Sequence, residues 1–516
     1  MLGVMTGDSR AVYKALDLPS VLSSTQYPTY TMGNVIIYAV SGFSAIGGFL
    51  FGYDIGVISG VIAIGQFSEF MTGEAALDSV TKATVVSILL AGCFVGALVS
   101  GILADVFGRR WSIFGGSILF ILGAALQAAA TKLTMMYGGR VIAGLAIGSL
   151  SMVVPLYQSE IAPKEIRGRL ISLQQWAITI GILVSFWIDY GTSFMEGTIS
   201  WRIPLGIQTA PALILAIGML FMPYSPRWLL DKDRDEDAWV VLARLHGNGD
   251  KNHPLVQEEF NEIKESIRIE REESVRSYSE LFKGTVLRRL ILGVFIQIFQ
   301  QLTGINSIMY YAPAIFQQAG LQGTSASLLA TGINGVLNML ATIPAILYID
   351  RWGRRWTLIS GAAIMGGSML IIGAIMASVG KTIYNDNGSK SVDLTGHTGA
   401  SYTIIVFIYI FVMAFAYSWG PIGWIYPCEI YPLRIRAKAT SVTTAANWLF
   451  NFIIGYITPL LMDSITWGVY ILLMCFCVIM SLSVYFFYPE TKGRSLEEME
   501  VIFGSKSSFV NGDEKA

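Results

Sequence analysis

Charged residues are scarce in this chain of 516 residues, where Asp, Glu, Lys and Arg make up 14% of the sequence. Soluble domains carry ~25%. Hydrophobic residues reach 53%, and the formal net charge is -1. The basic residues form no dense tract of the kind that binds polyanions, so we expect no nucleic-acid partner. The composition instead indicates that the bulk of the chain lies in a lipid bilayer.

Cysteine and histidine are also few. The thiols lie in or beside apolar runs, where a cysteine behaves as a small hydrophobic residue, and the imidazoles lie outside these runs and offer no proton relay. We find neither a disulfide framework nor a metal site, and no nucleophile lies at a plausible spacing from a base. We therefore expect a protein that is not an enzyme, with no catalytic residues, no metal and no cofactor. The residues concerned are Cys93, Cys428, Cys475 and Cys477, with His246, His253 and His397.

Apolar runs long enough to cross ~30 Å of hydrocarbon occur twelve times. They form two sets of six, within residues 36–222 and 290–488. A charge-rich linker with short helices joins the sets at 223–289, and hydrophilic arms occupy 1–35 and 489–516. The N-terminal arm has no apolar core like that of a signal peptide. The predicted fold is an all-α membrane protein with twelve transmembrane helices in two six-helix repeats.

Basic residues in the short loops predict the orientation of the spans, because such residues concentrate on the cytoplasmic side. They follow spans two, four, eight and ten, which places the linker and both termini in the cytoplasm. The longest loop on the opposite side contains Asn387-Gly388-Ser389, an acceptor pattern for N-glycosylation. Such tripeptides also arise by chance.

Two sequence motifs recur between the halves. Residues 105–110, DVFGRR, return as DRWGRR at 350–355, and EIAP at 160–163 returns as EIYP at 429–432. A duplicated bundle with a solute site between its halves predicts alternating access by rocking. We expect salt bridges across the halves to hold the cytoplasmic side shut. The alternative is that these residues only cap helices and set the topology. The predicted gate comprises Arg109, Arg110, Glu160, Arg167, Arg354, Arg355, Glu429 and Arg436.

Further motifs carry a resemblance to a known family. They are PYSPRW after span six, QQLTGIN in span seven and PETKG after span twelve, beside the two GRR loops. Together they resemble the sugar porters of the major facilitator superfamily, and especially fungal hexose transporters, over about residues 36–500. Tyr224 stands where the family usually has a glutamate, and Val106 where it has a basic residue. Both departures remove a charge from the N-terminal half of the predicted gate.

Amides inside the spans suit an uncharged polyol, which needs neutral hydrogen-bonding groups beside apolar faces. Gln297, Gln300 and Gln301 share one face of span seven, and Thr303-Gly304 loosens that helix before Asn306. The alternative is that buried amides only join helices. In contrast, Gly92-x-x-x-Gly96 and Gly144-x-x-x-Gly148 predict close helix packing. By resemblance, the sugar-binding positions are Gln175, Gln300, Gln301, Asn306, Asn338, Trp424 and Asn447, with Trp448 beside them.

Only two charged residues are predicted well inside the spans, Asp54 and Arg140. Charged side chains in hydrocarbon are costly in free energy and usually form ion pairs with one another. The resemblance implies that Asp54 binds a coupling proton and that Arg140 is its partner. If the two residues form a purely structural ion pair instead, the protein is a facilitator without proton coupling. We expect a plasma-membrane importer, functional as a monomer, for a monosaccharide such as glucose with a proton. A facilitator for hexoses or pentoses and a transporter-like sugar sensor are the alternatives. The sequence does not discriminate among sugars.

Overall fold

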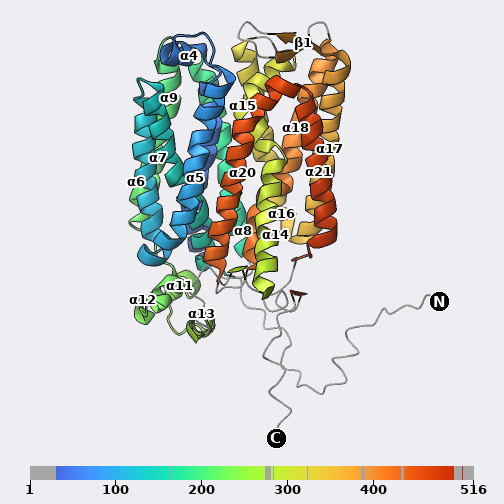
Figure 1. Ribbon diagram of the computed structural model, residues 1–516. Coiled ribbons are helices and arrows are strands. Elements are labelled where there is room, and N and C mark those ends of the chain that lie inside the picture. Colours follow the sequence, from blue (N-terminus) through green and yellow to red (C-terminus); the bar gives the residue numbers. More distant parts are fainter. Residues whose placement is uncertain are drawn as a thin grey trace, which may run out of the picture.

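The computed structural model describes residues 31–163, 166–272, 281–282, 284–321, 323–384, 390–394, 397–431, 435–492 and 502–503. Twelve helical segments in this part of the chain are long and apolar enough to cross a membrane. Two bundles of six stand side by side, and three short helices lie below one bundle (Figure 1). The prediction of twelve spans in two six-helix repeats is confirmed, and the chain is a multi-pass membrane protein.

The N-terminal half contains the first six spans. Spans one and six each consist of two helices, and a short helix, α4, follows span one. The helices are α2 (Thr31–Ser44), α3 (Ile46–Val61), α4 (Gly65–Thr72), α5 (Ser79–Phe107), α6 (Arg109–Ala128), α7 (Leu133–Ile161), α8 (Arg167–Thr192), α9 (Ile199–Ile207) and α10 (Thr209–Met219).

The C-terminal half repeats this arrangement, with two-part helices at spans seven and ten. A two-stranded antiparallel hairpin follows span nine. The elements are α14 (Gly284–Leu302), α15 (Ile305–Gln318), α16 (Thr324–Trp352), α17 (Arg354–Val379), β1 (Lys381–Tyr384), β2 (Lys390–Asp393), α18 (Thr398–Tyr417), α19 (Trp419–Ile430), α20 (Arg436–Ile465) and α21 (Gly468–Phe487).

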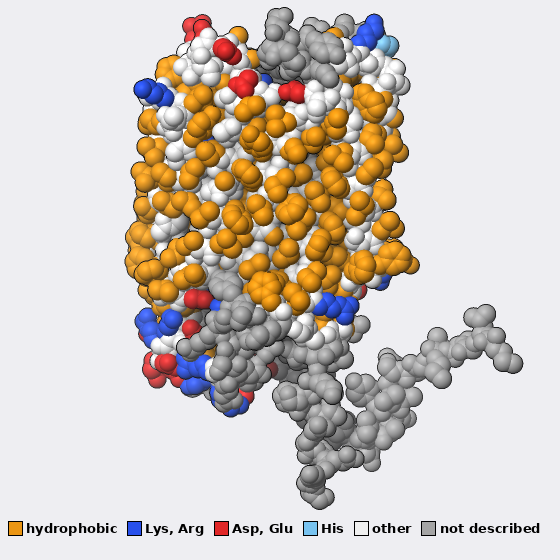
Figure 2. Space-filling view, viewed as in Figure 1, with side chains coloured by type: hydrophobic (Ala, Val, Ile, Leu, Met, Phe, Trp, Pro, Cys, Tyr) orange, Lys and Arg blue, Asp and Glu red, His pale blue; other side chains and the backbone are white. Residues whose placement is uncertain are grey.

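Hydrophobic side chains cover the middle of the bundle, and charged side chains gather at its two ends (Figure 2). We call the end that carries α11–α13 the linker face and the end that carries α4 and β1 the hairpin face (Figure 1). A band of this kind is what a bilayer requires, because ionised groups are costly in hydrocarbon.

The linker forms a small helical unit with its own core. Its helices are α11 (Pro226–Asp231), α12 (Asp235–His246) and α13 (Pro254–Glu272). The hydroxyl oxygen of Ser225 accepts a hydrogen bond from the backbone N–H of Trp228 at 3.2 Å, and Pro226 opens α11, so local sequence fixes where this helix begins. Trp239 and Phe260 pack edge to face at 4.2 Å between ring centroids and join α12 to α13.

Glycines allow α5 and α7 to pack backbone to backbone. A Cβ atom built on Gly144 would lie 3.1 Å from Cα of Gly92, and one built on Gly92 would lie 3.2 Å from Cα of Gly144. Gly96 and Gly148 likewise face backbone atoms of the opposite helix, at Leu145 and Cys93. The close packing predicted from these glycine pairs is present.

A break in span seven turns its polar residues toward neighbouring helices. The Thr303 hydroxyl donates to the Gln300 carbonyl at 2.7 Å, and Gly304 adopts a positive φ of 86°, which ends α14 before α15 begins. The Tyr311 hydroxyl then donates to the Gly455 carbonyl at 2.7 Å and holds α15 against α20. The predicted loosening at Thr303-Gly304 is therefore a complete interruption of the helix.

Candidate functional site

Three amides of spans seven and eleven form a buried cluster in the C-terminal half. Asn447 Nδ2 donates to Gln297 Oε1 at 2.5 Å and to Gln300 Oε1 at 2.8 Å. Gln297 Nε2 donates to the Gly423 carbonyl at 2.7 Å, and Gln300 Nε2 donates to the Trp419 carbonyl at 2.9 Å. The cluster thus joins α14, α19 and α20.

Gln175 brings the N-terminal half to this cluster. It lies in α8, and a Cβ atom built on Gly420 of α19 would lie 3.2 Å from Gln175 Nε2. The carbonyl of the same Gly420 accepts a second hydrogen bond from Gln300 Nε2, at 3.1 Å. Gln175 and Gln300 therefore both lie close to Gly420, where the two halves meet.

The predicted site residues differ in how much hydrogen-bonding capacity they retain. Gln300 uses both its amide N–H groups and its oxygen within the protein, as expected for an amide that joins helices. Asn306 Nδ2 donates to Gln301 Oε1 at 2.6 Å, which leaves Asn306 Oδ1 and Gln301 Nε2 free among the described residues. The side chains of Gln175 and Asn338 are also buried, and they form no hydrogen bond with any residue that the structure describes. These four amides can bind a polyol without breaking an existing bond.

Aromatic side chains pack where the two halves meet. The indole N–H of Trp448 in α20 donates to Ser151 Oγ in α7 at 3.0 Å, and Phe51 of α3 packs on the same indole at 4.8 Å between centroids. Trp424 is half-buried in α19, next to Gly423, whose carbonyl accepts from Gln297. Sequence reasoning missed Ser151 and Phe51, because nothing in one sequence distinguishes them from other residues of the core.

Asp54 and Arg140 form an ion pair inside the N-terminal half. Arg140 Nη1 lies 3.5 Å from Asp54 Oδ2, and neither side chain is more than 1% exposed. The guanidinium also donates to Gln127 Oε1 and to the Val86 carbonyl, both at 3.4 Å. The pair therefore joins α3 and α7, with further bonds to α6 and α5.

A third charged side chain is enclosed in the N-terminal half, close to the end of its span. Asp189 of α8 is fully buried, although it lies only three residues before the helix ends at Thr192. It fits because its carboxyl group packs on Gly60 of α3, which has no side chain. In the sequence, a glycine at position 60 indicates a place where a neighbouring group can pack closely, but the sequence does not show that this group is Asp189.

Arg109 and Glu160 form the centre of an ion-pair cluster at the linker face of the N-terminal half. Arg109 Nη2 lies 2.9 Å from Glu160 Oε1, and Nη1 lies 3.4 Å from Asp105 Oδ1. The Ser225 hydroxyl donates to the other Glu160 oxygen at 2.5 Å. The cluster ties the ends of spans two, three and four to the start of the linker.

The C-terminal half repeats this cluster. Arg354 Nη2 lies 2.6 Å from Glu429 Oε1, and the Thr491 hydroxyl donates to Glu429 Oε2 at 2.6 Å. The pairs Arg109–Glu160 and Arg354–Glu429 each join helices of one half, so the prediction of bridges between the halves is wrong for these two pairs. A duplicated motif shows which residues are equivalent but not which of them meet.

The remaining predicted gate arginines bind backbone carbonyls where the structure describes them. Arg110 donates to the Leu220 carbonyl and Arg355 to the Tyr485 carbonyl, in equivalent positions. Arg436 Nη2 donates to the Tyr431 carbonyl at 3.3 Å. The side chain of Arg167 lies outside the described residues, as do the N-terminal arm up to residue 30, Asn387 and the tail from residue 493 apart from 502–503.

Tyr224 makes the two clusters chemically different. In the C-terminal half, Glu490 accepts hydrogen bonds from the backbone N–H groups of Arg354 and Arg355 at 2.8 and 3.0 Å, at the start of α17. In the N-terminal half, Tyr224 accepts from the Trp111 indole at 2.9 Å, and the Arg110 guanidinium lies 4.9 Å from its ring centroid. A cation–π contact thus stands where the other half has a carboxylate.

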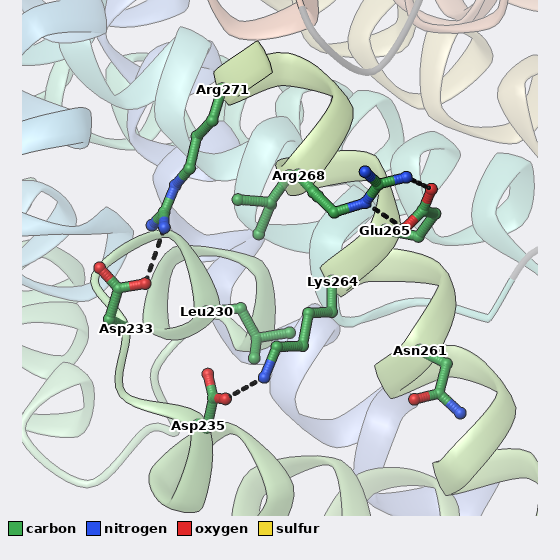
Figure 3. Close-up of a pocket in the computed structure, with 9 residues that line it drawn as sticks. Leu230, Asp233, Asp235, Asn261, Lys264, Glu265, Arg268 and Arg271 are labelled. Atoms are coloured by element: carbon green, nitrogen blue, oxygen red, sulfur yellow. Dashed lines mark hydrogen bonds and ion pairs between the residues drawn. The ribbon is translucent and has the colours of Figure 1, made fainter.

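A cavity of about 760 Å³ lies in the linker (Figure 3), and none of its lining residues belongs to the amide cluster. Its basic side chains are paired: Lys264 with Asp235, Arg268 with Glu265 and Arg271 with Asp233. Hydrogen bonds from these arginines hold the pKa of Asp233 and of Glu265 below the usual range. Three acids balance three bases, so the cavity has no net attraction for an anion.

Two six-helix halves with buried amides near their boundary are the arrangement expected of a transporter. The sequence model of the family described as "Sugar (and other) transporter" matches residues 40–503. The chain belongs to this family, and it is a sugar transporter that works by alternating access, not an enzyme.

Two curated relatives cover nearly the whole chain. The chain is 40% identical to the MFS glucose transporter mfs1 of Aspergillus flavus over 485 residues, which is 91% of this chain and 90% of the relative. It is 38% identical to the high-affinity glucose transporter of Kluyveromyces lactis over 468 residues, which is 90% of this chain and 84% of the relative.

A solved structure agrees with these matches. The proton:xylose symporter XylE bound to 6-bromo-6-deoxy-D-glucose superimposes with a TM-score of 0.77 at 29% identity, over 91% of this chain and 100% of XylE. The family resemblance predicted from the motifs is confirmed.

Proposed function

We propose that this protein imports a hexose such as glucose across the plasma membrane, coupled to the inward movement of a proton. The linker face, with its arginine clusters, is the cytoplasmic face in this proposal, and both termini are cytoplasmic. The protein works as a monomer within the bilayer and needs no cofactor besides the coupling ion.

The amides support the proposed substrate. Those of Gln175, Gln301, Asn306 and Asn338 retain donors and acceptors, and Trp424 and Trp448 add apolar faces. Because both halves contribute, binding of the sugar stabilises the conformation in which they close around it. The glucose transporters among the relatives favour a hexose over other polyols.

The observation that carries proton coupling is the buried pair of Asp54 and Arg140. A carboxylate in a membrane span is costly unless it is paired or neutral, so separating it from Arg140 favours uptake of a proton. Alternation between these two arrangements would link the charge of Asp54 to the conformation of α3 and α7. The similarity to a proton:xylose symporter is consistent with this role.

Uptake of labelled sugars by cells that lack their own hexose transporters tests the proposal. Glucose, xylose and galactose are supplied separately, with and without a protonophore. We expect glucose to accumulate above its external concentration and the protonophore to abolish the accumulation. Equilibration of the sugar without accumulation, unchanged by the protonophore, would identify a facilitator in which Asp54 and Arg140 are a structural pair.

A further inference from the structure

Asp189 is a buried carboxyl group to which the proposed proton pathway gives no role. Its side chain has no exposed surface, and no described side chain donates a hydrogen bond to either carboxyl oxygen, whose polar neighbour is the backbone of Gly60. No described arginine, lysine or histidine pairs with it, in contrast to Asp54. In such surroundings an isolated carboxylate has a far higher free energy than the neutral acid, because protonation removes the buried charge.

The helices around Asp189 place no free cation beside it. Tyr53 of α3 is the titratable side chain that interacts with it electrostatically, and the Tyr53 hydroxyl donates to the Pro204 carbonyl at 2.9 Å. The charged residues of the helices packed on α8 are committed elsewhere or distant. Three of them are in ion pairs: Arg140 of α7 with Asp54, Glu160 of α7 with Arg109, and Glu429 of α19 with Arg354. Arg202 of α9 donates to the carbonyls of Ala128 and Ala130. Arg351 of α16 lies at the linker end of its helix, and α2 has no charged residue.

Asp189 lies on a helix that packs against the other half, while its carboxyl group faces Gly60 of α3 in its own half. Leu183 and Phe186 of α8 pack against Gly335 of α16, and Trp187 packs against Gly332, so α8 forms part of the boundary between the halves. Asp189 follows Trp187 by two residues and lies three residues before the end of α8 at Thr192. Less than one helical turn, ~5 Å, therefore separates this carboxyl group from the end of the span.

We propose that Asp189 is a second proton-binding site, occupied in the conformation described here and exchanging its proton with water at the hairpin face when the halves separate there. The carboxylate takes up one proton from water as it becomes buried, and the neutral acid returns that proton when water reaches it. The exchange step rests on the proposed proton-coupled function, but the protonation of Asp189 in the closed protein does not.

Infrared spectroscopy of the full-length protein in lipid nanodiscs tests the protonation. We expect the parent to show the carbonyl stretch of a buried protonated carboxyl group at neutral pH, and Asp189→Asn to lose this band. Asp54→Asn, the matched control, should keep it. Identical bands in the parent and Asp189→Asn would mean that Asp189 is ionised and would overturn the proposal.

A second measurement uses the parent alone, in case Asp189→Asn does not fold. Hydrophobic carbodiimides modify protonated carboxyl groups in membranes, so mass spectrometry should find an adduct on Asp189 that becomes less abundant as the pH rises. Absence of the adduct at every pH at which the protein stays folded would contradict a protonated Asp189.

The exchange step is tested by the number of protons that enter vesicles per sugar. Asp189→Asn should lower this number while sugar exchange across the membrane continues. An unchanged number, with the infrared band lost, would show a permanently neutral acid and overturn the exchange step. If the parent moves no sugar or no protons at all, the proposed function fails, but the infrared result still decides whether Asp189 carries a proton.

Discussion

Asn306 and Gln301 are held by a single hydrogen bond to each other, so each keeps one polar atom for a ligand. Asn306→Ala removes a direct ligand group and also frees Gln301 to move. We expect sugar affinity to fall by about 1–3 kcal/mol, with normal insertion into the membrane. Binding of labelled sugar to purified protein measures this effect.

Asn451→Ala is the matched control for Asn306→Ala. Asn451 is also a buried asparagine of the C-terminal half, but its oxygen accepts from the Tyr310 hydroxyl at 3.0 Å and holds α15 to α20. It should alter thermal stability more than affinity. Equal sugar affinity in the parent and in Asn306→Ala, with both in the membrane, would show that the site lies elsewhere.

At the scale of a helix, the contact between α5 and α7 depends on the absence of side chains. Gly144→Ala places a methyl group against the backbone of α5 and should destabilise the protein by about 1–3 kcal/mol. Gly138→Ala in the same helix meets no atom within 4 Å and should be neutral or slightly stabilising. The melting temperatures of the two variants in detergent should therefore differ, and similar values would argue against tight packing at Gly144.

The starts of α6 and α17 should respond differently to substitution. Glu490 places a negative charge and two acceptors at the N-terminus of α17, where both favour the helix, whereas Tyr224 offers α6 a ring and a hydroxyl. We expect Glu490→Gln to cost about 1–3 kcal/mol of folding free energy and Tyr224→Phe less. Thermal unfolding followed by circular dichroism compares the two variants. A larger loss for Tyr224→Phe would refute the asymmetry between the clusters.

For the whole molecule, Asp54→Asn separates sugar movement from its energy source. The amide mimics the protonated acid permanently, so the variant should bind sugar and exchange it down a gradient but lose accumulation and sugar-induced proton entry. Asp78→Asn, which changes a carboxylate in the cap of α5 at the hairpin face, should behave like the parent. Accumulation by Asp54→Asn equal to that of the parent would remove Asp54 from the coupling step.

The orientation of the molecule is tested by labelling in intact cells. Glu74→Cys lies on the hairpin face and Asp250→Cys in the linker, and both positions are exposed. An impermeant maleimide should label the first and not the second, until the membrane is permeabilised. A glycosidase should also increase the gel mobility of the parent if Asn387 carries a glycan. Labelling of Asp250→Cys in intact cells would reverse the assigned orientation.

The bilayer explains why so much of the fold could be predicted. Hydrocarbon imposes a length and an apolar composition on each span, and both are visible in one sequence. Contacts between spans are not visible, so the burial of Asp189 against Gly60 was missed. For the same reason the gate residues were expected to pair across the halves, whereas Arg109 pairs with Glu160 of its own half. The amides were found because polar side chains are conspicuous in spans, but the sequence could not show that Gln300 is already saturated with hydrogen bonds.

The two arginine–glutamate pairs also bear on the turnover number. Two of the described contacts that join the halves, Trp448 with Ser151 and Ser441 with the Ala97 carbonyl, are neutral hydrogen bonds of about 1 kcal/mol each. A third joins the Ser79 hydroxyl to the carboxylate of Asp463. Breaking a buried ion pair costs ~3–5 kcal/mol, and every 1.4 kcal/mol in a barrier is roughly a factor of ten in rate. Arg109–Glu160 and Arg354–Glu429 each lie within one half, so the rocking of the halves does not require either pair to separate. The two pairs therefore add nothing to the activation free energy of rocking. Separation of these two pairs should then not limit the turnover number of the carrier.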